Sequence, residues 1–305
     1  WKRRRMSVHS VHIYPIKSCG GISARQALVE RNGFRFDRKW MVVDEEKNRM
    51  VTQRKCPELA RVRTALPVEA LTISDPTAVR GALTVSVDDR TLEVPLEERV
   101  WGLARRKATV WSFTAEGCLD EGDEAADFFT KLVKFPCRLV RFNEDCTRRT
   151  EEGFAPRGQT AFSDGFPFLV ATRESLDAVN DQLELQGDEK VPMDRFRANV
   201  VLQGLGEPFV EDRIKQIQIE SAEPTIFDLV KPCSRCTVTT VDQEAGQGTG
   251  RQPLQALTTI HSGKKAEYGR KEWDRVPFFG WNGVVDPSMI GRVVSVDSAA
   301  RVMST

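Results

Sequence analysis

The stretch KPCSRCTVTTVD, from Lys231 to Asp242, joins a close pair of cysteines to a run of β-branched residues. Cys233 and Cys236 stand three positions apart, and residues 237–241, which follow them, read TVTTV. Branching at Cβ restricts a side chain in a helix and suits the pleated surface of a strand. The stretch therefore predicts a strand that Cys236 enters, and it favours a β-rich fold.

Similar patterns extend outward from this stretch over most of the chain. Hairpins are predicted at residues 40–53 and 83–94, where runs of β-forming residues flank the polar turns 44–48 and 88–90. Further runs of β-forming residues predict strands at 8–14, 166–171, 199–202, 214–219, 225–230 and 293–296. The predicted fold class is accordingly mostly β, of the α+β type.

Two segments change to the apolar spacing of a helix. The first follows Gly122 and has apolar residues at positions 126, 129 and 132, with two acidic residues in its first turn, where they suit the helix dipole. The second has apolar residues at positions 176, 179 and 183, and Thr172 stands where it can cap the N-terminus. We therefore expect few helices among many strands.

The length of 305 residues exceeds that of a usual single domain, so two domains are expected. A polar stretch at residues 143–158 is typical of a linker or an exposed loop. We place the boundary there, with a β-rich N-terminal domain at 7–145 and a second domain at 146–300.

Charge and cysteine content exclude several classes of protein. Lys and Arg number 45 and Asp and Glu number 44, so a net charge of +1 gives no overall field that would attract nucleic acid. Seven cysteines at scattered positions in a long chain are typical of free thiols in a reducing, intracellular compartment. No stretch of about eighteen consecutive apolar residues is present to span a bilayer.

The first residues, Trp1 to Arg5, combine one aromatic side chain with four basic ones. Such a sequence is typical of the interfacial flank of a membrane anchor, which would lie upstream. A frayed basic tail explains the same residues equally well, and the sequence leaves both interpretations open.

The cysteine pair allows several kinds of site. A structural zinc ion needs four ligands, and none of the three histidines lies at the required spacing (His9, His12 and His261). A dithiol redox site needs a helix N-terminus, whereas a strand is predicted here. Two alternatives stay open: a pair of small buried residues, or a single thiolate on a soft metal whose other ligands come with an organic cofactor. Arg235 next to Cys236 would favour the thiolate.

Several motifs in order along nearly the whole chain resemble those of one family. KPCSRCTVTTVD is similar to the cysteine segment of the MOSC domain proteins, which bind the molybdenum cofactor. More closely, the chain resembles the amidoxime-reducing components, which are mitochondrial in animals and have plant and algal relatives. The other motifs that carry the resemblance are IYPIKSC (13–19), GFRFDRKWMVVD (33–44), an acidic segment at 120–124, FSDGFPFLV (162–170), DRFRANVV (194–201) and VDQEAGQ (241–247).

The resemblance implies a β-rich N-terminal domain followed by a β-barrel-like MOSC domain, with a molybdopterin cofactor between them. It implies an enzyme that reduces N-hydroxylated compounds such as amidoximes and hydroxylamines, with electrons from cytochrome b5 and its NADH-dependent reductase. It also implies a place at the mitochondrial outer membrane, facing the cytosol, and a cytoplasmic protein is the alternative. A sulfur-transfer or cofactor-carrier protein is the alternative, because MOSC domains also end the molybdenum cofactor sulfurases.

The resemblance also implies roles for individual residues. Cys236 would be the protein ligand to molybdenum and a catalytic residue. Chemical reasoning adds a second catalytic residue: reduction of an N–OH group needs orientation and protons, and Asp164, as a carboxyl close to the metal, is the candidate for both, although its Ser-Asp-Gly setting also suits a plain turn. The cofactor would be bound by Lys17, Ser18 and Arg38 from the first domain and by Asp164, Gly165, Arg197, Asn199, Ser234, Arg235 and Cys236 from the second.

The chemistry of these residue types suits such a cofactor. Guanidinium groups bind phosphate through two hydrogen bonds, and a lysine adds a point charge, although most of the 45 basic residues are expected to be solvated surface cations. The glycine cluster GQGTG (246–250) precedes Arg-Gln-Pro and so predicts a turn, not a dinucleotide-binding loop. An external electron donor is therefore expected.

Overall fold

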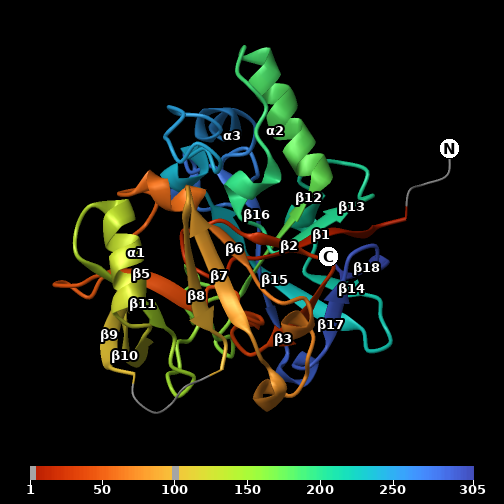
Figure 1. The fold of residues 1–305 in the computed structure, drawn as a ribbon. Helices are drawn as coiled ribbons and strands as arrows, with labels where there is room; N and C mark the ends of the chain where they lie inside the picture. The colour runs from red at the N-terminus through yellow and green to blue at the C-terminus, as the bar shows by residue number, and fades with distance from the viewer. Residues whose placement is uncertain (1–4, 98–102) are drawn as a thin grey trace.

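The computed structural model describes residues 5–97 and 103–305, and its strands far outnumber its helices (Figure 1). Most of the basic flank predicted at the N-terminus, Trp1 to Arg4, lies outside the described residues. The mostly β fold class is confirmed.

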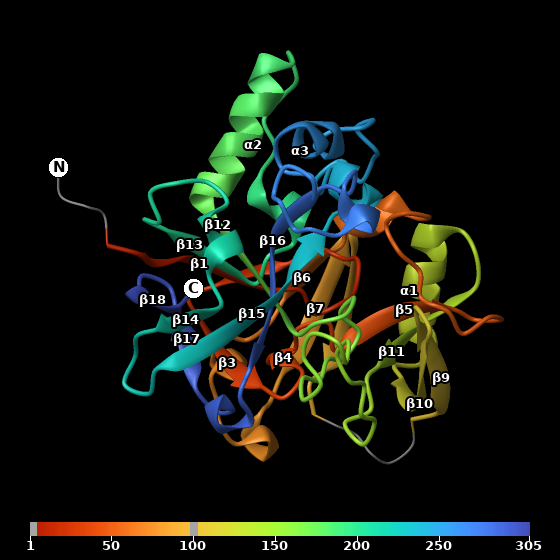
Figure 2. The ribbon, with the colours of Figure 1, turned by 180° about the vertical axis from the view of Figure 1, so that it is seen from behind.

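One eight-stranded sheet forms the centre of the molecule (Figure 2). Its first strand in sequence, β1, pairs antiparallel with β13 from the second half of the sequence, with Val11 opposite Val200. The loop that follows β1 is thereby held against the second half of the chain. The strands in sheet order are β18 (Ala300–Ser304), β14 (Gln216–Ile219), β15 (Thr225–Ser234), β16 (Phe278–Val285), β12 (Phe168–Thr172), β13 (Val200–Gln203), β1 (Ser7–Ile13) and β2 (Ile22–Ala24).

Three smaller sheets account for the remaining strands. A four-stranded sheet has the order β5 (Trp40–Asp44), β11 (Cys137–Arg141), β10 (Phe113–Asp120) and β9 (Arg105–Val110). Two three-stranded sheets have the orders β17 (Val293–Ser295), β3 (Gln26–Glu30), β4 (Gly33–Phe34) and β6 (Arg63–Ala65), β7 (Ala82–Val87), β8 (Arg90–Pro95). Strand β7 alternates buried and half-buried residues, so one face of this last sheet packs on a core shared with β5 and β11.

Three α-helices cover the sheets in the part of the chain that the structure describes. Helix α1 (Asp123–Val133) begins after Gly122, whose φ of 93° favours glycine, and buries its apolar face. Helix α2 (Arg173–Leu185) begins at Thr172, whose hydroxyl accepts a hydrogen bond from the amide of Ser175. Helix α3 (Leu254–Ile260) is short. None of the described helices combines the length and the apolar character required to cross a membrane.

Short 3-10 helices occur at η1 (Pro57–Arg61), η2 (Glu69–Leu71), η3 (Pro76–Ala78), η4 (Met193–Phe196), η5 (Val210–Arg213), η6 (Thr237–Thr240), η7 (Lys271–Trp273) and η8 (Pro287–Met289).

The predicted elements are mostly present. Both helices, the cap at Thr172 and the hairpin formed by β7 and β8 are confirmed. The hairpin at 40–53 is only half right, because its second arm meets β5 at the isolated bridge from Met50 to Val43 and forms no strand. The stretch 143–158 is without strand or helix, as predicted, but it is not wholly exposed, since Arg148 is buried.

The strand predicted at 237–241 is wrong, since residues 237–240 form the 3-10 helix η6 and Cys236 stands at its N-cap. Threonine hydroxyls explain the difference. Thr239 donates its hydroxyl to the carbonyl of Cys236, and Thr240 donates to that of Thr237, both over 2.9 Å. These local bonds to the backbone outweigh the β propensity of the branched side chains.

Candidate functional site

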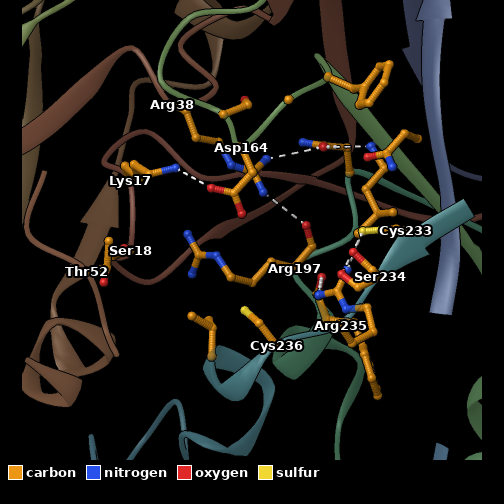
Figure 3. Close-up of a pocket in the computed structure, with 18 of the residues that line it drawn as sticks. Lys17, Ser18, Arg38, Thr52, Asp164, Arg197, Cys233, Ser234, Arg235 and Cys236 are labelled. Carbon is orange, nitrogen blue, oxygen red and sulfur yellow. Dashed lines mark hydrogen bonds and ion pairs between the residues drawn. The ribbon is translucent and has the colours of Figure 1, made fainter. Parts of the chain in front are cut away.

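All ten residues that the resemblance singled out line one pocket. Figure 3 labels most of them. Lys17, Ser18 and Arg38 reach it from loops next to β1 and β5, and the other seven come from the second half of the chain. Residues as far apart in sequence as Lys17 and Cys236 therefore share a site because β1 pairs with β13.

Backbone hydrogen bonds fix the two loops of the first half. The amide of Lys17 donates to the carbonyl of Trp40 over 2.8 Å, and the amide of Arg38 donates to the carbonyl of Tyr14 over 2.8 Å. Arg38 also accepts a hydrogen bond from the amide of Phe162 over 3.1 Å, which ties it to the segment that carries Asp164. Backbone hydrogen bonds within the protein thus hold both loops in place.

Arg38 belongs to a buried network with Asp37 and Asn199. Its Nη1 donates to both carboxylate oxygens of Asp37, over 2.8 and 2.6 Å, and to Oδ1 of Asn199 over 3.2 Å. The amide group of Asn199 also bonds the backbone of His12 and Leu169 and the carboxylate of Asp37. Asn199 therefore has its donors and acceptors engaged within the protein, and it holds Arg38 in place.

Arg38 and Arg197 come together at Tyr14. Their guanidinium carbons lie 4.4 and 4.3 Å from the centre of its ring. Burial, followed by the charge of Arg38, lowers the pKa of Arg197 to about 10. One nitrogen of Arg197, Nη2, is buried without a hydrogen-bond partner in the described structure, and so is Nε of Arg235. Unpaired buried donors of this kind are unfavourable unless an acceptor reaches them.

Lys17 and Asp164 form an ion pair in the pocket, with 2.6 Å between Nζ and Oδ1 (Figure 3). Burial lowers the pKa of Lys17, whose side chain is only 7% exposed, and the charge of Asp164 offsets part of this effect. The Asp164 side chain lines the pocket and is 70% exposed.

The surroundings of Asp164 favour its ionised form. Desolvation would raise the pKa of Asp164, but the charge and hydrogen bond of Lys17, with the hydrogen bond of Trp111, hold it well below its usual range. Because solvent reaches most of this side chain, we regard desolvation as the smaller influence. Asp164 is thus a carboxylate at neutral pH and not a ready proton donor.

The two cysteines have different cationic neighbours. Arg235 donates from Nη1 to the sulfur of Cys233 over 2.9 Å and from Nη2 to the carbonyl of Phe196. The expectation that Arg235 acts on the thiol of Cys236 is therefore not met, because its guanidinium turns toward Cys233. The cation at Cys236 is Arg54, whose Nη2 lies 3.0 Å from Sγ.

Strained backbone accumulates around the pocket. Ser18, Arg38, Trp111 and Arg197 all line it, and their φ angles are 69°, 48°, 53° and 57°. Side chains other than glycine rarely adopt this region, at a cost of roughly 1–3 kcal/mol each, and such residues gather at functional sites. The geometry therefore marks this pocket independently of any sequence motif.

Sequence patterns did not indicate four further residues at the pocket. Thr52, Arg54 and Trp111 line it. Arg148 supports it by donating hydrogen bonds to the carbonyls of Ala161, Ser163 and Asp164. Arg148 fixes the backbone that presents Asp164, and burial lowers its own pKa to about 10. Its place in a polar stretch gave no sign of burial. The sequence patterns did not mark Trp111, because the hairpin of β9 and β10 that carries it was not predicted.

The lining fits a polar, anionic group that carries a soft metal. One exposed carboxylate, that of Asp164, lies among five cationic side chains: Lys17, Arg38, Arg54, Arg197 and Arg235. Arg197 and Arg235 each have a buried nitrogen without a partner in the described structure. These donors suit a phosphate and a pterin, and Cys236 offers one sulfur ligand.

Comparison with known proteins agrees with this composition. Residues 5–136 match the MOSC N-terminal beta barrel domain, and residues 157–296 match the MOSC domain. The chain is 32% identical to mitochondrial amidoxime-reducing component 1 of Mus musculus over 295 residues, which are 92% of this chain and 79% of that protein. It is 30% identical to mitochondrial amidoxime reducing component 2 of Homo sapiens, over 92% of this chain and 81% of that protein.

A second kind of relative is similar over a smaller part of its own length. The molybdenum cofactor sulfurase of Oryza sativa subsp. japonica is 29% identical over 270 residues, which are 84% of this chain but 31% of that protein. The amidoxime-reducing components, by contrast, match over most of both sequences. The chain belongs to the family of the amidoxime-reducing components, with a MOSC N-terminal beta barrel domain followed by a MOSC domain.

Proposed function

We propose that this protein is a molybdenum cofactor-dependent reductase of N-hydroxylated compounds such as amidoximes and hydroxylamines. The observation that carries the proposal is the convergence of Cys236 with Lys17, Arg38 and Arg197 in one pocket, where Nη2 of Arg197 has no acceptor among the described residues. The cofactor, when bound, would supply the two-electron chemistry that protein side chains lack.

Each group of residues has a distinct part in this proposal. Lys17, Arg38 and Arg197 would hold the anionic part of the cofactor, and Ser18, Gly165, Ser234 and Arg235 its polar edge. Cys236 would be the protein ligand to molybdenum. Asn199 would act indirectly, because its amide group already bonds Arg38 and Asp37.

Breaking the N–O bond of an amidoxime takes two electrons and two protons, gives the amidine, and releases the oxygen as water. The ionised carboxylate of Asp164 can accept a hydrogen bond from the substrate's N–OH group. The ammonium group of Lys17, 2.6 Å away, is the proton donor in reach of the same carboxylate, and burial lowers its pKa. Asp164 would therefore orient the substrate, and the ammonium group of Lys17 would supply the proton.

Electrons would come from cytochrome b5 and its NADH-dependent reductase, in keeping with the need for an external donor. The relatives are mitochondrial components by name. We propose that this protein lies at the mitochondrial outer membrane, facing the cytosol, with an anchor upstream of Trp1. Sequencing of the complete precursor tests the anchor, because a start codon directly before Trp1 would contradict it.

Reduction of benzamidoxime tests the function directly. The purified protein is mixed with NADH, cytochrome b5 and cytochrome b5 reductase, and benzamidine is measured. We expect turnover that requires all components and is absent from the Cys236→Ser variant. A persulfide on Cys236 without benzamidoxime reduction would favour the sulfur-transfer alternative, which the resemblance to the rice sulfurase raises.

A further inference from the structure

Trp111 stands at the tip of the hairpin formed by β9 and β10, in a conformation that is unfavourable for it. Val110 pairs with Phe113, so Trp111 and Ser112 form a two-residue turn. The φ angle of Trp111 is 53°, and in such turns the first position is usually glycine, asparagine or aspartate. Because this conformation is unfavourable for a bulky residue, the presence of Trp111 indicates a functional role.

The tip is held firmly in spite of this conformation. Arg49 donates from Nη2 to the carbonyl of Trp111 over 3.2 Å, and the amide of Met50 donates to the carbonyl of Thr109 over 2.9 Å. The hydroxyl groups of Thr109 and Thr114 lie 2.9 Å apart across the two strands. The segment after β5 thus holds the turn in place and fixes the position of the Trp111 backbone.

The indole of Trp111 lines the pocket and is not part of a core. It is 37% exposed, and its Nε1 donates to Oδ1 of Asp164 over 3.1 Å. That oxygen is also the one that accepts from Lys17. The indole therefore lies beside the carboxylate to which we assign the orientation of the substrate.

Arg54 lies over the ring of Trp111, with its guanidinium carbon 4.6 Å from a ring centre. The same guanidinium reaches Sγ of Cys236 over 3.0 Å. A planar group of one carbon and three nitrogens thus fits between the indole and the thiol. A guanidinium and an amidoxime share a planar, conjugated carbon bonded to nitrogen donors, so this position fits either group.

We propose that the indole of Trp111 is a stacking platform for the planar amidine part of the substrate, which takes the place of the Arg54 guanidinium. The Arg54 side chain is exposed and can turn outward into solvent. The platform selects planar N-hydroxylated amidines and guanidines over N-hydroxylated amines with saturated substituents. This inference rests on the proposed reductase function and specifies the substrate class.

The binding test uses variants that keep the protein folded. Trp111→Gly removes the indole at a position with positive φ, where glycine is relaxed, so stability should stay equal or rise. Trp111→Phe keeps a ring but loses the hydrogen bond to Asp164. Leu185→Ala, at an exposed apolar side chain outside the pocket, is the control.

Calorimetric titration with benzamidine, the product of benzamidoxime reduction, measures binding at the indole platform without turnover. We expect Trp111→Gly to weaken binding roughly three- to tenfold, as loss of an aromatic stacking partner does, and Trp111→Phe to weaken it less. Leu185→Ala should bind as the wild type does. Equal binding by Trp111→Gly and the wild type, or no binding of benzamidine by the wild type, would overturn the proposal.

A kinetic comparison separates this inference from the proposed function. The ratio of kcat/KM for benzamidoxime to kcat/KM for N-cyclohexylhydroxylamine should fall roughly three- to tenfold in Trp111→Gly. An unchanged ratio in an active enzyme would refute the platform while the reductase function stands. If neither compound is reduced but Trp111→Gly still weakens benzamidine binding, the platform stands and the reductase function fails.

Discussion

The guanidinium of Arg54 donates to the sulfur of Cys236 over 3.0 Å, although the two residues are 182 positions apart in sequence. Arg54 follows β5 in the first domain, and Cys236 stands at the N-cap position of η6 in the second. The contact places a cation at the thiol that we propose as the molybdenum ligand.

Arg54→Gln should slow the alkylation of Cys236 by iodoacetamide in cofactor-free protein roughly three- to tenfold at pH 7. The guanidinium of Arg54 lies 3.0 Å from Sγ of Cys236, and its positive charge attracts the anionic sulfur that reacts, whereas glutamine keeps a long polar side chain without the charge. The modified fraction is measured by peptide mass spectrometry against time. Arg235→Gln is the matched control, because Arg235 contacts Cys233, and it should slow only the alkylation of Cys233. An Arg54→Gln rate equal to that of the wild type would refute the assignment.

Cys233→Ser and Cys236→Ser should have unequal effects. Cys236 lines the pocket next to Arg54, and its replacement should abolish benzamidoxime reduction while the cationic residues still hold some cofactor. Cys233 also lines the pocket, but its sulfur accepts a hydrogen bond from Arg235 and it packs against the core that includes α2, so its replacement should retain most activity. Molybdenum content and turnover are measured for both variants. Equal loss of activity in the two would indicate a shared role and contradict this account.

Arg38→Met should lower both cofactor content and stability. It leaves the carboxylate of Asp37 buried without its cation, and breaking a buried ion pair costs about 3–5 kcal/mol. Burial already raises the pKa of Asp37, so its contribution to stability is present at acidic pH and is lost as pH rises through that pKa. Without Arg38 this pKa rises further, and the destabilisation should therefore be larger at pH 7.5 than at pH 5. Urea unfolding at both pH values measures it, with Arg38→Lys as the charge-preserving control. An equal loss at both would contradict the network.

Glu211, which lies outside the pocket, should give the unfolding free energy a second dependence on pH. Burial raises its pKa to about 7, and the hydrogen bond from Ser175 offsets only part of this effect. The neutral form is favoured in the folded protein, so this contribution to stability is full below about pH 4.5 and is lost as pH rises through about 7. Glu211→Gln should flatten the fall in unfolding free energy between pH 5 and pH 8. A variant with the same slope as the wild type would show that Glu211 does not titrate in this range.

Local patterns were sufficient for most of the fold. The helices after Gly122 and Thr172 follow from apolar spacing and caps, and the hairpin of β7 and β8 follows from the polar turn between two β-forming runs. The second arm of the hairpin at 40–53 was not predictable in this way, because residues 48–50 also bond Thr109 of β9. The strand predicted at 237–241 was wrong because threonine hydroxyl groups donate to the backbone there and stabilise a 3-10 turn.

Motif resemblance supplied the site where local patterns could not. The ten residues that it indicated line one pocket, although their binding of the cofactor stays a prediction. Arg54, Trp111 and Arg148 were missed since their functions depend on contacts across the fold, with Cys236, with Asp164 and with the backbone of Ala161. The contact of Arg235 with Cys233 was equally invisible, because adjacency in sequence does not fix where a long side chain points.

The central claim is that Cys236 and the cationic pocket hold a molybdenum cofactor that reduces N-hydroxylated compounds. The most direct measurement is the molybdenum and pterin content of the purified protein together with its rate of benzamidoxime reduction in the reconstituted NADH chain. We expect molybdenum and pterin in equal amounts, approaching one of each per chain, and turnover that rises in proportion to that content. Zinc in place of molybdenum, or full molybdenum content without benzamidine formation, would contradict the account.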